Sequence, residues 1–292
     1  MSNSSDKEIT MKSLIIMLSL VFFFSCSTEN MPQKDIEFYE VKGKVNHLTI
    51  RHFYAEDNNG EIVKGEPNRE GEPDQTITFD KKGYISQVYF YGESDSLDIK
   101  LVREYNDKHL CIGETRYDAN GNVISDWIWL YDENNNNTER IQVMTDSSLY
   151  TFWKLYYDDE NRLVSEKSTP NPQSGYFDST YWVLDELGRQ IEEQNHGYYG
   201  PYGTKKVEYE GKSELPAKIW FYDGYDELNY IVDIQYNDHD LVTKADQYDP
   251  DSTLVLSVSF EYTYDDKGNW ITKVLSYEGE PSSYEERRII YY

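Results

Sequence analysis

The feature that most constrains the fold is a repeat of about 26 residues that runs through most of the chain. Each unit carries an anchor, usually an aromatic residue followed by an acid or Asn, directly before a short polar turn. The anchors are Phe79-Asp80, Tyr105-Asn106, Tyr131-Asp132, Tyr157-Asp158, Leu184-Asp185, Tyr209-Glu210, Tyr236-Asn237 and Tyr264-Asp265. A further unit is expected to begin upstream, near Tyr54. The chain therefore consists of similar units stacked in series rather than of one irregular core.

Each unit is predicted to be a β-hairpin. A second turn lies near its middle, as at Tyr117-Asp118 and Tyr248-Asp249, and the segments between turns are rich in Tyr, Val, Ile, Trp and Thr. Alternate residues such as Trp127, Trp129 and Tyr131 share one side of their strand. We expect an all-β, elongated antiparallel meander of about nine ~26-residue hairpins, forming a curved or rolled sheet, with no helix beyond the signal peptide. A β-propeller is the alternative, because four strands make one blade.

The N-terminus carries an export signal. Residues 13–24 are 12 mostly apolar residues preceded by Lys12, the length of a signal-peptide core and too short to span a bilayer. Ser25-Cys26 closes this stretch and resembles the lipobox of bacterial lipoproteins, although Phe23 stands where that family usually has Leu. The resemblance implies that Cys26 receives diacylglycerol and becomes the new N-terminus. An ordinary secretory signal with a chance cysteine is the alternative.

These assignments divide the chain into a signal peptide (1–25), the lipidated cysteine and linker (26–40) and a β domain (41–292). The expected location is the bacterial cell envelope. The lipid on Cys26 would hold the protein on a membrane, which is expected to be the outer membrane. The sequence does not distinguish the periplasmic face of that membrane from its surface face.

The turns resemble the YD repeats of RHS-type proteins. The matching segments are residues 117–124, 157–163, 185–189 and 264–270, and the resemblance covers about residues 50–292. In that family the repeats form long curling sheets, which in large members close into a shell around a toxin. This chain is expected to be too short to enclose a cargo, so the resemblance implies a scaffold or a binding surface.

Charge and motifs argue against several functions. The formal net charge of −26 repels phosphate backbones, so nucleic acid is not an expected partner. No zinc-protease, serine-hydrolase, phosphate-loop or CxxC motif is present, and His47 and His52 are expected on opposite faces of a strand. We therefore predict no enzyme, cofactor or metal, while a glycosidase with paired carboxylates stays as the lesser alternative.

Two further features favour structural roles. Acidic turns such as Asp57/Asn59, Asp249/Asp251 and residues 132–137 offer oxygen ligands for calcium, but Asp and Asn commonly bond their own turn backbone instead. Cys111 occupies a position that is apolar in the other units, so it is expected to pack as a small core residue.

The segment 195–203 (NHGYYGPYG) departs from the repeat, because its turn is longer and contains three tyrosines and three glycines. Tyr198, Tyr199 and Tyr202 are the candidate ligand-binding residues, with an extracellular glycan or protein as the possible partner. A structural turn is the alternative. The tryptophans at 127, 129, 153 and 182 are expected in the core stripe. The predicted function is thus a binding or scaffold module of the envelope that presents an aromatic-rich sheet surface, with a purely structural envelope component as the alternative.

Overall fold

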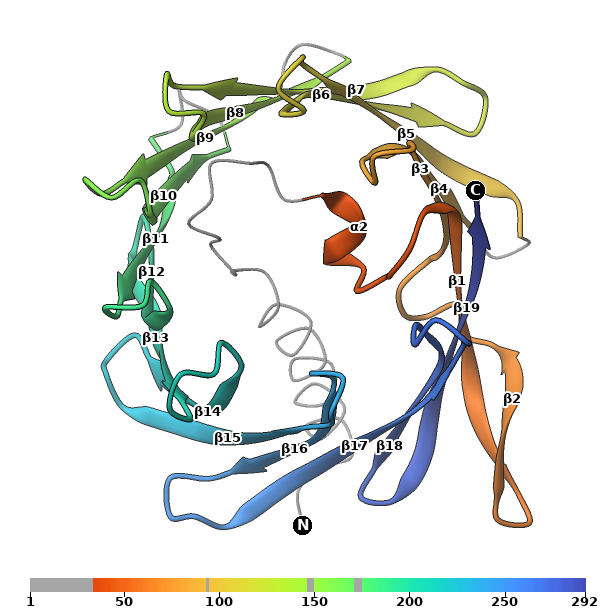
Figure 1. The fold of residues 1–292 in the computed structure, drawn as a ribbon. Coiled ribbons are helices and arrows are strands. Elements are labelled where there is room, and N and C mark those ends of the chain that lie inside the picture. The colour runs from red at the N-terminus through yellow and green to blue at the C-terminus, as the bar shows by residue number, and fades with distance from the viewer. Residues whose placement is uncertain (1–33, 93–94, 146–149, 171–174) are drawn as a thin grey trace.

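The computed structural model describes residues 34–92, 95–145, 150–170 and 175–292. These residues form one short helix and a single antiparallel sheet of nineteen strands (Figure 1). The helix is α2 (Asp35–Phe38). The strands are β1 (Val45–Asn58), β2 (Glu61–Pro67), β3 (Asp74–Phe79), β4 (Ile85–Tyr91), β5 (Leu97–Tyr105), β6 (Cys111–Asp118), β7 (Val123–Tyr131), β8 (Asn137–Met144), β9 (Tyr150–Tyr157), β10 (Leu163–Thr169), β11 (Asp178–Leu184), β12 (Gln190–Gly197), β13 (Gly200–Tyr209), β14 (Pro216–Asp223), β15 (Leu228–Tyr236), β16 (Val242–Tyr248), β17 (Leu254–Tyr264), β18 (Trp270–Tyr277) and β19 (Glu280–Tyr291).

A recurrent turn ends the strands where the repeat anchors predicted it. The first residue of the turn accepts hydrogen bonds through its side-chain oxygen from the backbone N–H groups two and four residues later. The fourth residue has a positive φ, as in Gly83 (+95°) and Gly188 (+81°), and the strand register shifts beside it. This is a type I turn followed by a bulge. The side-chain bonds form at Asp80, Asn106, Asp118, Asp132, Asp158, Asp185, Asp223, Asn237 and Asp265.

The expectation of an open, curved or rolled meander is wrong, and so is the propeller alternative, because the sheet closes on itself. β1 pairs with β19 over nine residue pairs, from Val45–Tyr291 to Tyr54–Ser283, and also pairs with β3. Eighteen strands, all except β2, therefore form one closed antiparallel barrel. Closure pairs the two edge strands of the meander with each other. In an open sheet, the N–H and C=O groups of these edges would be free to pair with another chain and cause aggregation.

The first unit also differs from the expected hairpin at Tyr54. β1 runs on to Asn58 and returns as β2 through Asn59-Gly60, which both have positive φ as a two-residue hairpin turn requires. β2 pairs with the end of β1 and is not one of the strands of the barrel wall.

Residues 34–44, which we call the N-terminal strap, lie inside the ring (Figure 1) and include the one-turn helix α2 that the sequence did not predict. Ile36 and Val41 pack in an apolar cluster with buried residues of β1, β3, β4 and β5, among them Leu48, Ile77 and Phe79. A second apolar cluster lies on β14–β18 and contains Ile219, Val232, Ile234, Val242, Ala245, Val258 and Leu275. The contacts of the strap with the first cluster identify the inner face of the sheet.

The outer face of the barrel is mixed and carries many charges. Charged side chains on this face alternate with inward-facing neighbours along their strands. Examples are Lys154, Lys167, Lys218, Asp233 and Glu261. Apolar rows also cross this face, such as Ile128–Ile141–Phe152 on β7–β9 and Trp220–Ile231–Tyr248 on β14–β16. The described outer face thus combines charged side chains with exposed apolar ones such as Ile128, Leu130 and Val183.

No helix among the described residues is long and apolar enough to cross a membrane.

Candidate functional site

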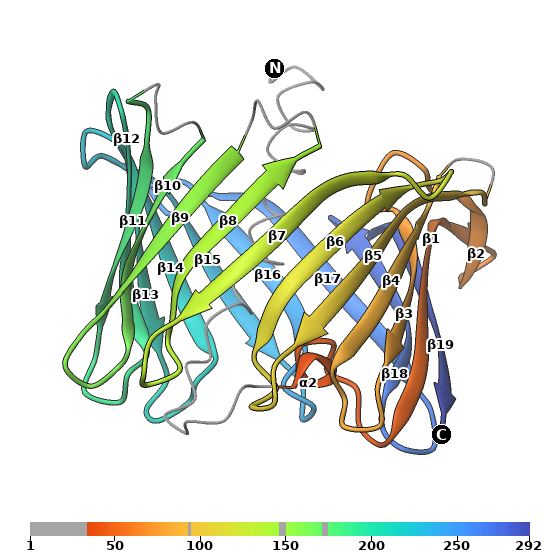
Figure 2. The same ribbon diagram turned by 90° about the horizontal axis from the view of Figure 1, so that it is seen from above.

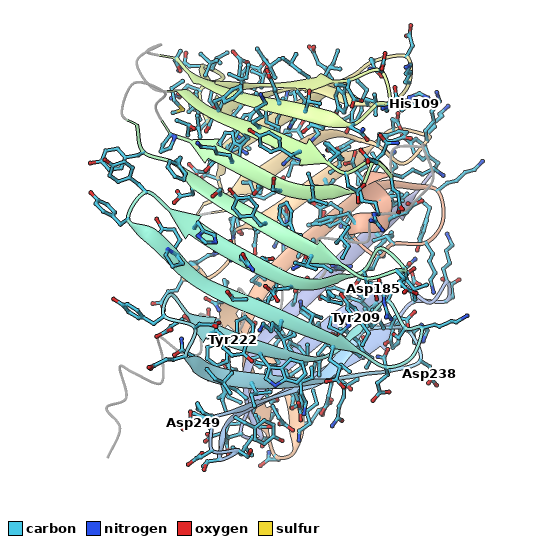
Figure 3. All side chains as sticks on the ribbon, turned by 90° about the vertical axis from the view of Figure 1, so that its left-hand side faces the viewer. His109, Asp185, Tyr209, Tyr222, Asp238 and Asp249 are labelled. Carbon is cyan, nitrogen blue, oxygen red and sulfur yellow. The ribbon has the colours of Figure 1, made fainter. Side chains whose placement is uncertain are left out.

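The barrel has two ends with different contents. The proximal rim holds the turns that begin at the repeat anchors, together with α2 and the C-terminus (Figure 2). The distal rim holds the mid-unit turns. Figure 3 shows the contrast, with His109, Asp185, Tyr209 and Asp238 toward one end of the strands and Tyr222 and Asp249 toward the other.

The predicted ligand residues Tyr198, Tyr199 and Tyr202 lie on the distal rim, in and beside the β12–β13 turn. All three are exposed, and Tyr199 is 81% accessible. Tyr198 and Tyr199 form a cluster with Tyr176, with ring centroids 4.8 Å (Tyr176–Tyr198) and 5.1 Å (Tyr198–Tyr199) apart. We call Tyr176, Tyr198, Tyr199 and Tyr202 the distal tyrosine cluster. Asp178 accepts a hydrogen bond of 2.9 Å from the Tyr202 hydroxyl, which raises the pKa of that hydroxyl.

Two glycines allow this arrangement because they leave room for neighbouring atoms that a Cβ would displace. A Cβ on Gly197 would collide with the ring and hydroxyl of Tyr202, and a Cβ on Gly224 would collide with the carbonyl of Pro201. The β12–β13 turn therefore sits directly against its neighbours, and the tyrosine rings project from a supported backbone.

The two cysteines have separate positions. Cys26 lies outside the described residues. Cys111 begins β6, and its thiol lies 3.6 Å from the carbonyl of Gly113. Burial raises the pKa of this thiol to about 12, so it is largely protonated at neutral pH and a poor nucleophile.

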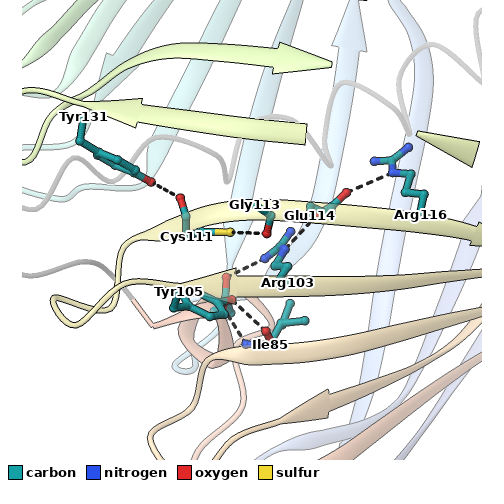
Figure 4. Close-up of polar contacts among 9 residues, drawn as sticks. Ile85, Arg103, Tyr105, Cys111, Gly113, Glu114, Arg116 and Tyr131 are labelled. Atoms are coloured by element: carbon teal, nitrogen blue, oxygen red, sulfur yellow. Dashed lines mark hydrogen bonds and ion pairs between the residues drawn. The ribbon is translucent and has the colours of Figure 1, made fainter. Parts of the chain in front are cut away.

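A polar network on the inner wall joins the strap to β5 and β6 (Figure 4). Asp35 of α2 accepts hydrogen bonds from Arg103 (2.9 Å), the Tyr105 hydroxyl (2.6 Å) and the backbone N–H of Ile85 (2.8 Å). Arg103 also contacts Glu114 at 3.1 Å, and Glu114 contacts Arg116 at 3.0 Å. Two guanidinium groups, Arg103 and Arg116, thus face two carboxylates, and the Glu114 side chain, which is only 4% exposed, contacts both guanidinium groups. The network orders the strap and has no free acid or base.

The tryptophans expected in the core stripe line this same face. Trp127 stacks on Trp153 with centroids 5.0 Å apart, and Arg116 lies 5.5 Å from the Trp127 ring. Trp182 is buried and donates its indole N–H to Glu193 at 3.3 Å. The inner wall of β6–β12 thus mixes large rings with charged groups.

The pKa values of two inner-wall carboxylates are shifted in opposite directions. Burial raises the pKa of Glu166, helped by the charge of Glu193 and opposed by Arg140. Burial also acts to raise the pKa of Glu193, but the Lys205 ammonium at 2.8 Å and hydrogen bonds from Lys205, Asn195 and Gln190 hold it below its ordinary value. By linkage, Glu166 favours the fold when protonated and weakens it as the pH rises through its folded pKa. Glu193 favours the fold while ionised, and this contribution is lost as the pH falls through its folded pKa.

The sequence reasoning missed why tyrosine, rather than phenylalanine, ends the strands. Tyr131 donates its hydroxyl proton to the carbonyl of Cys111 at 2.7 Å, which ties the end of β7 to the start of β6, its partner in the same hairpin. The same tie recurs at a separation of 19 or 20 residues, and burial raises the pKa of the Tyr131 and Tyr209 hydroxyls to about 12. The other pairs are Tyr105–Ile85, Tyr157–Asn137, Tyr209–Gln190, Tyr236–Pro216 and Tyr262–Val242. The signal was the constant spacing between these tyrosines and the start of the preceding strand.

The acidic turns considered for calcium use their oxygens internally. Asp57 accepts the Gly60 N–H, Asp132 accepts those of Asn134 and Asn136, and Asp251 accepts that of Thr253. Across the described residues, no three His, Cys, Asp or Glu side chains are grouped so as to hold a metal ion.

Comparisons with known proteins yield structural neighbours only. No protein-family model matches the sequence, and no curated protein matches it. A porin-like protein from Bacteroides uniformis ATCC 8492 is similar over 84% of this chain and 96% of its own, at 9% identity and a TM-score of 0.42. A porin-like protein from Bacteroides vulgatus ATCC 8482 covers 85% and 98% of the two chains, at 12% identity and a TM-score of 0.22. The structure of TcdB2-TccC3-TEV matches 70% of this chain but 15% of its own, at 10% identity and a TM-score of 0.19. At these identities and TM-scores the likeness defines neither a family nor an activity, and the class rests on the strand pairing, which is that of a closed antiparallel β-barrel.

Proposed function

We propose that the chain is a lipid-anchored protein of the bacterial cell envelope, without enzymatic activity, whose barrel presents the distal tyrosine cluster to an extracellular glycan. One observation carries the proposal. The exposed rings lie at the end of the barrel opposite to the end where α2 of the strap lies.

The position of the strap supports this orientation. Lys34, the first described residue, lies at the proximal rim eight positions after Cys26. Eight residues span at most ~29 Å when extended. A lipid on Cys26 would therefore keep the proximal rim close to the membrane and turn the distal rim toward the surroundings.

The anchor is tested by metabolic labelling. Cells fed a palmitate analogue should label the wild-type protein, and Cys26→Ser should abolish the label because the thiol is the acceptor. Label that persists in Cys26→Ser would refute the anchor.

The rings of the cluster suit a sugar better than a charged ligand. A tyrosine offers an apolar face for stacking and a hydroxyl for hydrogen bonds, and several rings must act together because each contact is weak. The turns of the distal rim carry many acids, such as Asp223, Asp226 and Asp249, so an uncharged ligand avoids their repulsion. A purely structural envelope role is the competing function, and it gives no reason for exposed rings here.

The binding proposal is tested with the full chain, purified in an uncharged detergent and screened against an array of bacterial and host glycans. For a glycan that binds, Tyr198→Ala/Tyr199→Ala/Tyr202→Ala should weaken binding at least about tenfold, equivalent to roughly 1.4 kcal/mol. Tyr54→Ala/Tyr156→Ala, which removes exposed rings elsewhere, should leave affinity unchanged. Equal binding by a folded triple variant would place the site elsewhere, and the absence of any glycan ligand would favour the structural role.

A further inference from the structure

A pocket at the proximal rim, opposite to the tyrosine cluster, has properties that no function considered so far uses. It has a volume of about 510 Å³ and lies between the strap and the turns that follow β3 and β5. The strap contributes Lys34 and Lys44, and the turns contribute Lys81, Lys82 and His109.

The charges around this pocket are unusual for a chain with a net charge of −26. Lys34, Lys44 and Lys81 form no ion pair within the described part of the chain, whereas lysines such as Lys205 and Lys273 pair with carboxylates. Four lysines therefore surround an opening in a protein whose surface otherwise favours cations.

The two acids that line the pocket offset only part of this charge, because two carboxylates stand against four lysines. Asp80 directs its Oδ1 atom to the backbone N–H groups of Lys82 and Tyr84, so that oxygen is already used inside the turn. Glu37 is the other carboxylate of the lining. The Lys82 Nζ atom lies 2.8 Å from Nε2 of His109, which places two nitrogen groups side by side at the edge of the pocket.

The floor of the pocket is apolar and fixed. Ile36, Val41 and Val45 belong to the buried cluster beneath it. Gly83 packs so tightly on Ile36 that a Cβ would come within 2.8 Å of the isoleucine side chain. The opening is thus a supported hollow with a cationic edge, larger than one inorganic phosphate needs.

We propose that this pocket binds a phosphate ester, with the lysines contacting the phosphate oxygens and the apolar floor contacting the organic part. Lysine is a common partner for phosphate because its compact ammonium interacts as a point charge. Two sources share this chemistry, namely a soluble phosphate ester and the headgroup of a phospholipid. The headgroup source rests on the proposed anchor, which would bring the proximal rim to the membrane, while the binding chemistry does not depend on it.

Titration calorimetry on the full chain in uncharged detergent tests the site with two probes, glycerol 3-phosphate, a soluble phosphate monoester, and glycerophosphoglycerol, the water-soluble phosphodiester of a lipid headgroup. We expect saturable binding of at least one probe that weakens as salt is raised. Lys81→Gln/Lys82→Gln should weaken binding at least tenfold. Lys154→Gln/Lys212→Gln, which removes the same charge outside the pocket, should not change it.

Preference for glycerophosphoglycerol would assign the pocket to a headgroup, and preference for glycerol 3-phosphate would assign it to a soluble phosphate ester. The absence of binding by both probes would overturn the proposal, as would equal weakening by the two double variants at an unchanged melting temperature. None of these outcomes depends on the glycan screen, so the two proposals fail separately.

Discussion

Removal of residues 280–292 should abolish cooperative folding. This deletion takes away β19, which pairs with β1 over nine residue pairs and with β18 on its other side. Two long edges would then expose unpaired N–H and C=O groups and become templates for aggregation. The truncated chain should lose its sharp thermal transition and its near-ultraviolet circular dichroism, and it should sediment as aggregates.

The matched control is excision of the β1–β2 hairpin tip, residues 56–63, rejoined through Asn-Gly. This change shortens a hairpin that lies outside the ring and leaves every pair of the closed ring in place. The control should keep a single cooperative transition. If the truncated chain melted like the control, closure through β1 and β19 would not be needed for stability.

Phe79→Ala should lower the free energy of unfolding by about 3–5 kcal/mol, the range for a buried phenylalanine. Phe79 is 1% exposed, its ring lies edge-on to Tyr39 of the strap with centroids 6.1 Å apart, and its backbone carbonyl accepts a hydrogen bond from Tyr292. Phe152→Ala, on the outer face of β9, should cost less because that ring leaves no enclosed cavity. Urea unfolding of the two variants measures both values, and equal losses would show that the inner and outer faces have been assigned wrongly.

The local structure of this protein could be read from its sequence, because turns and alternation are local properties. The Asp-to-Gly spacing in Asp80–Gly83 fixed the position of a turn, and the alternation from Trp127 to Tyr131 identified the inner face. Closure could not be read, because it depends on how stagger accumulates over eighteen strands until β19 meets β1.

The candidate sites divide along the same line. The distal tyrosines were singled out because the sequence of their turn departs from the repeat, but the turn, Tyr198-Tyr199, is shorter than expected and its binding role stays a prediction. Cys26 lies outside the described residues, and its lipidation also stays a prediction. The proximal pocket escaped notice because Lys34, Lys82 and His109 are separated by 27 to 75 positions and meet only where the strap folds into the ring. The strap itself gave little signal, since a four-residue helix has no visible period.

The tyrosine ties have a consequence for how such a protein changes size. Each tie lies within one hairpin, as in the bond from Tyr131 of β7 to Cys111 of β6, and each anchor turn joins only two successive hairpins. Gain or loss of one 26-residue unit would therefore leave every remaining tie intact and change the number of barrel strands by two. Because barrel diameter grows roughly in proportion to strand number, duplication within the gene offers relatives with wider or narrower bores without new packing rules.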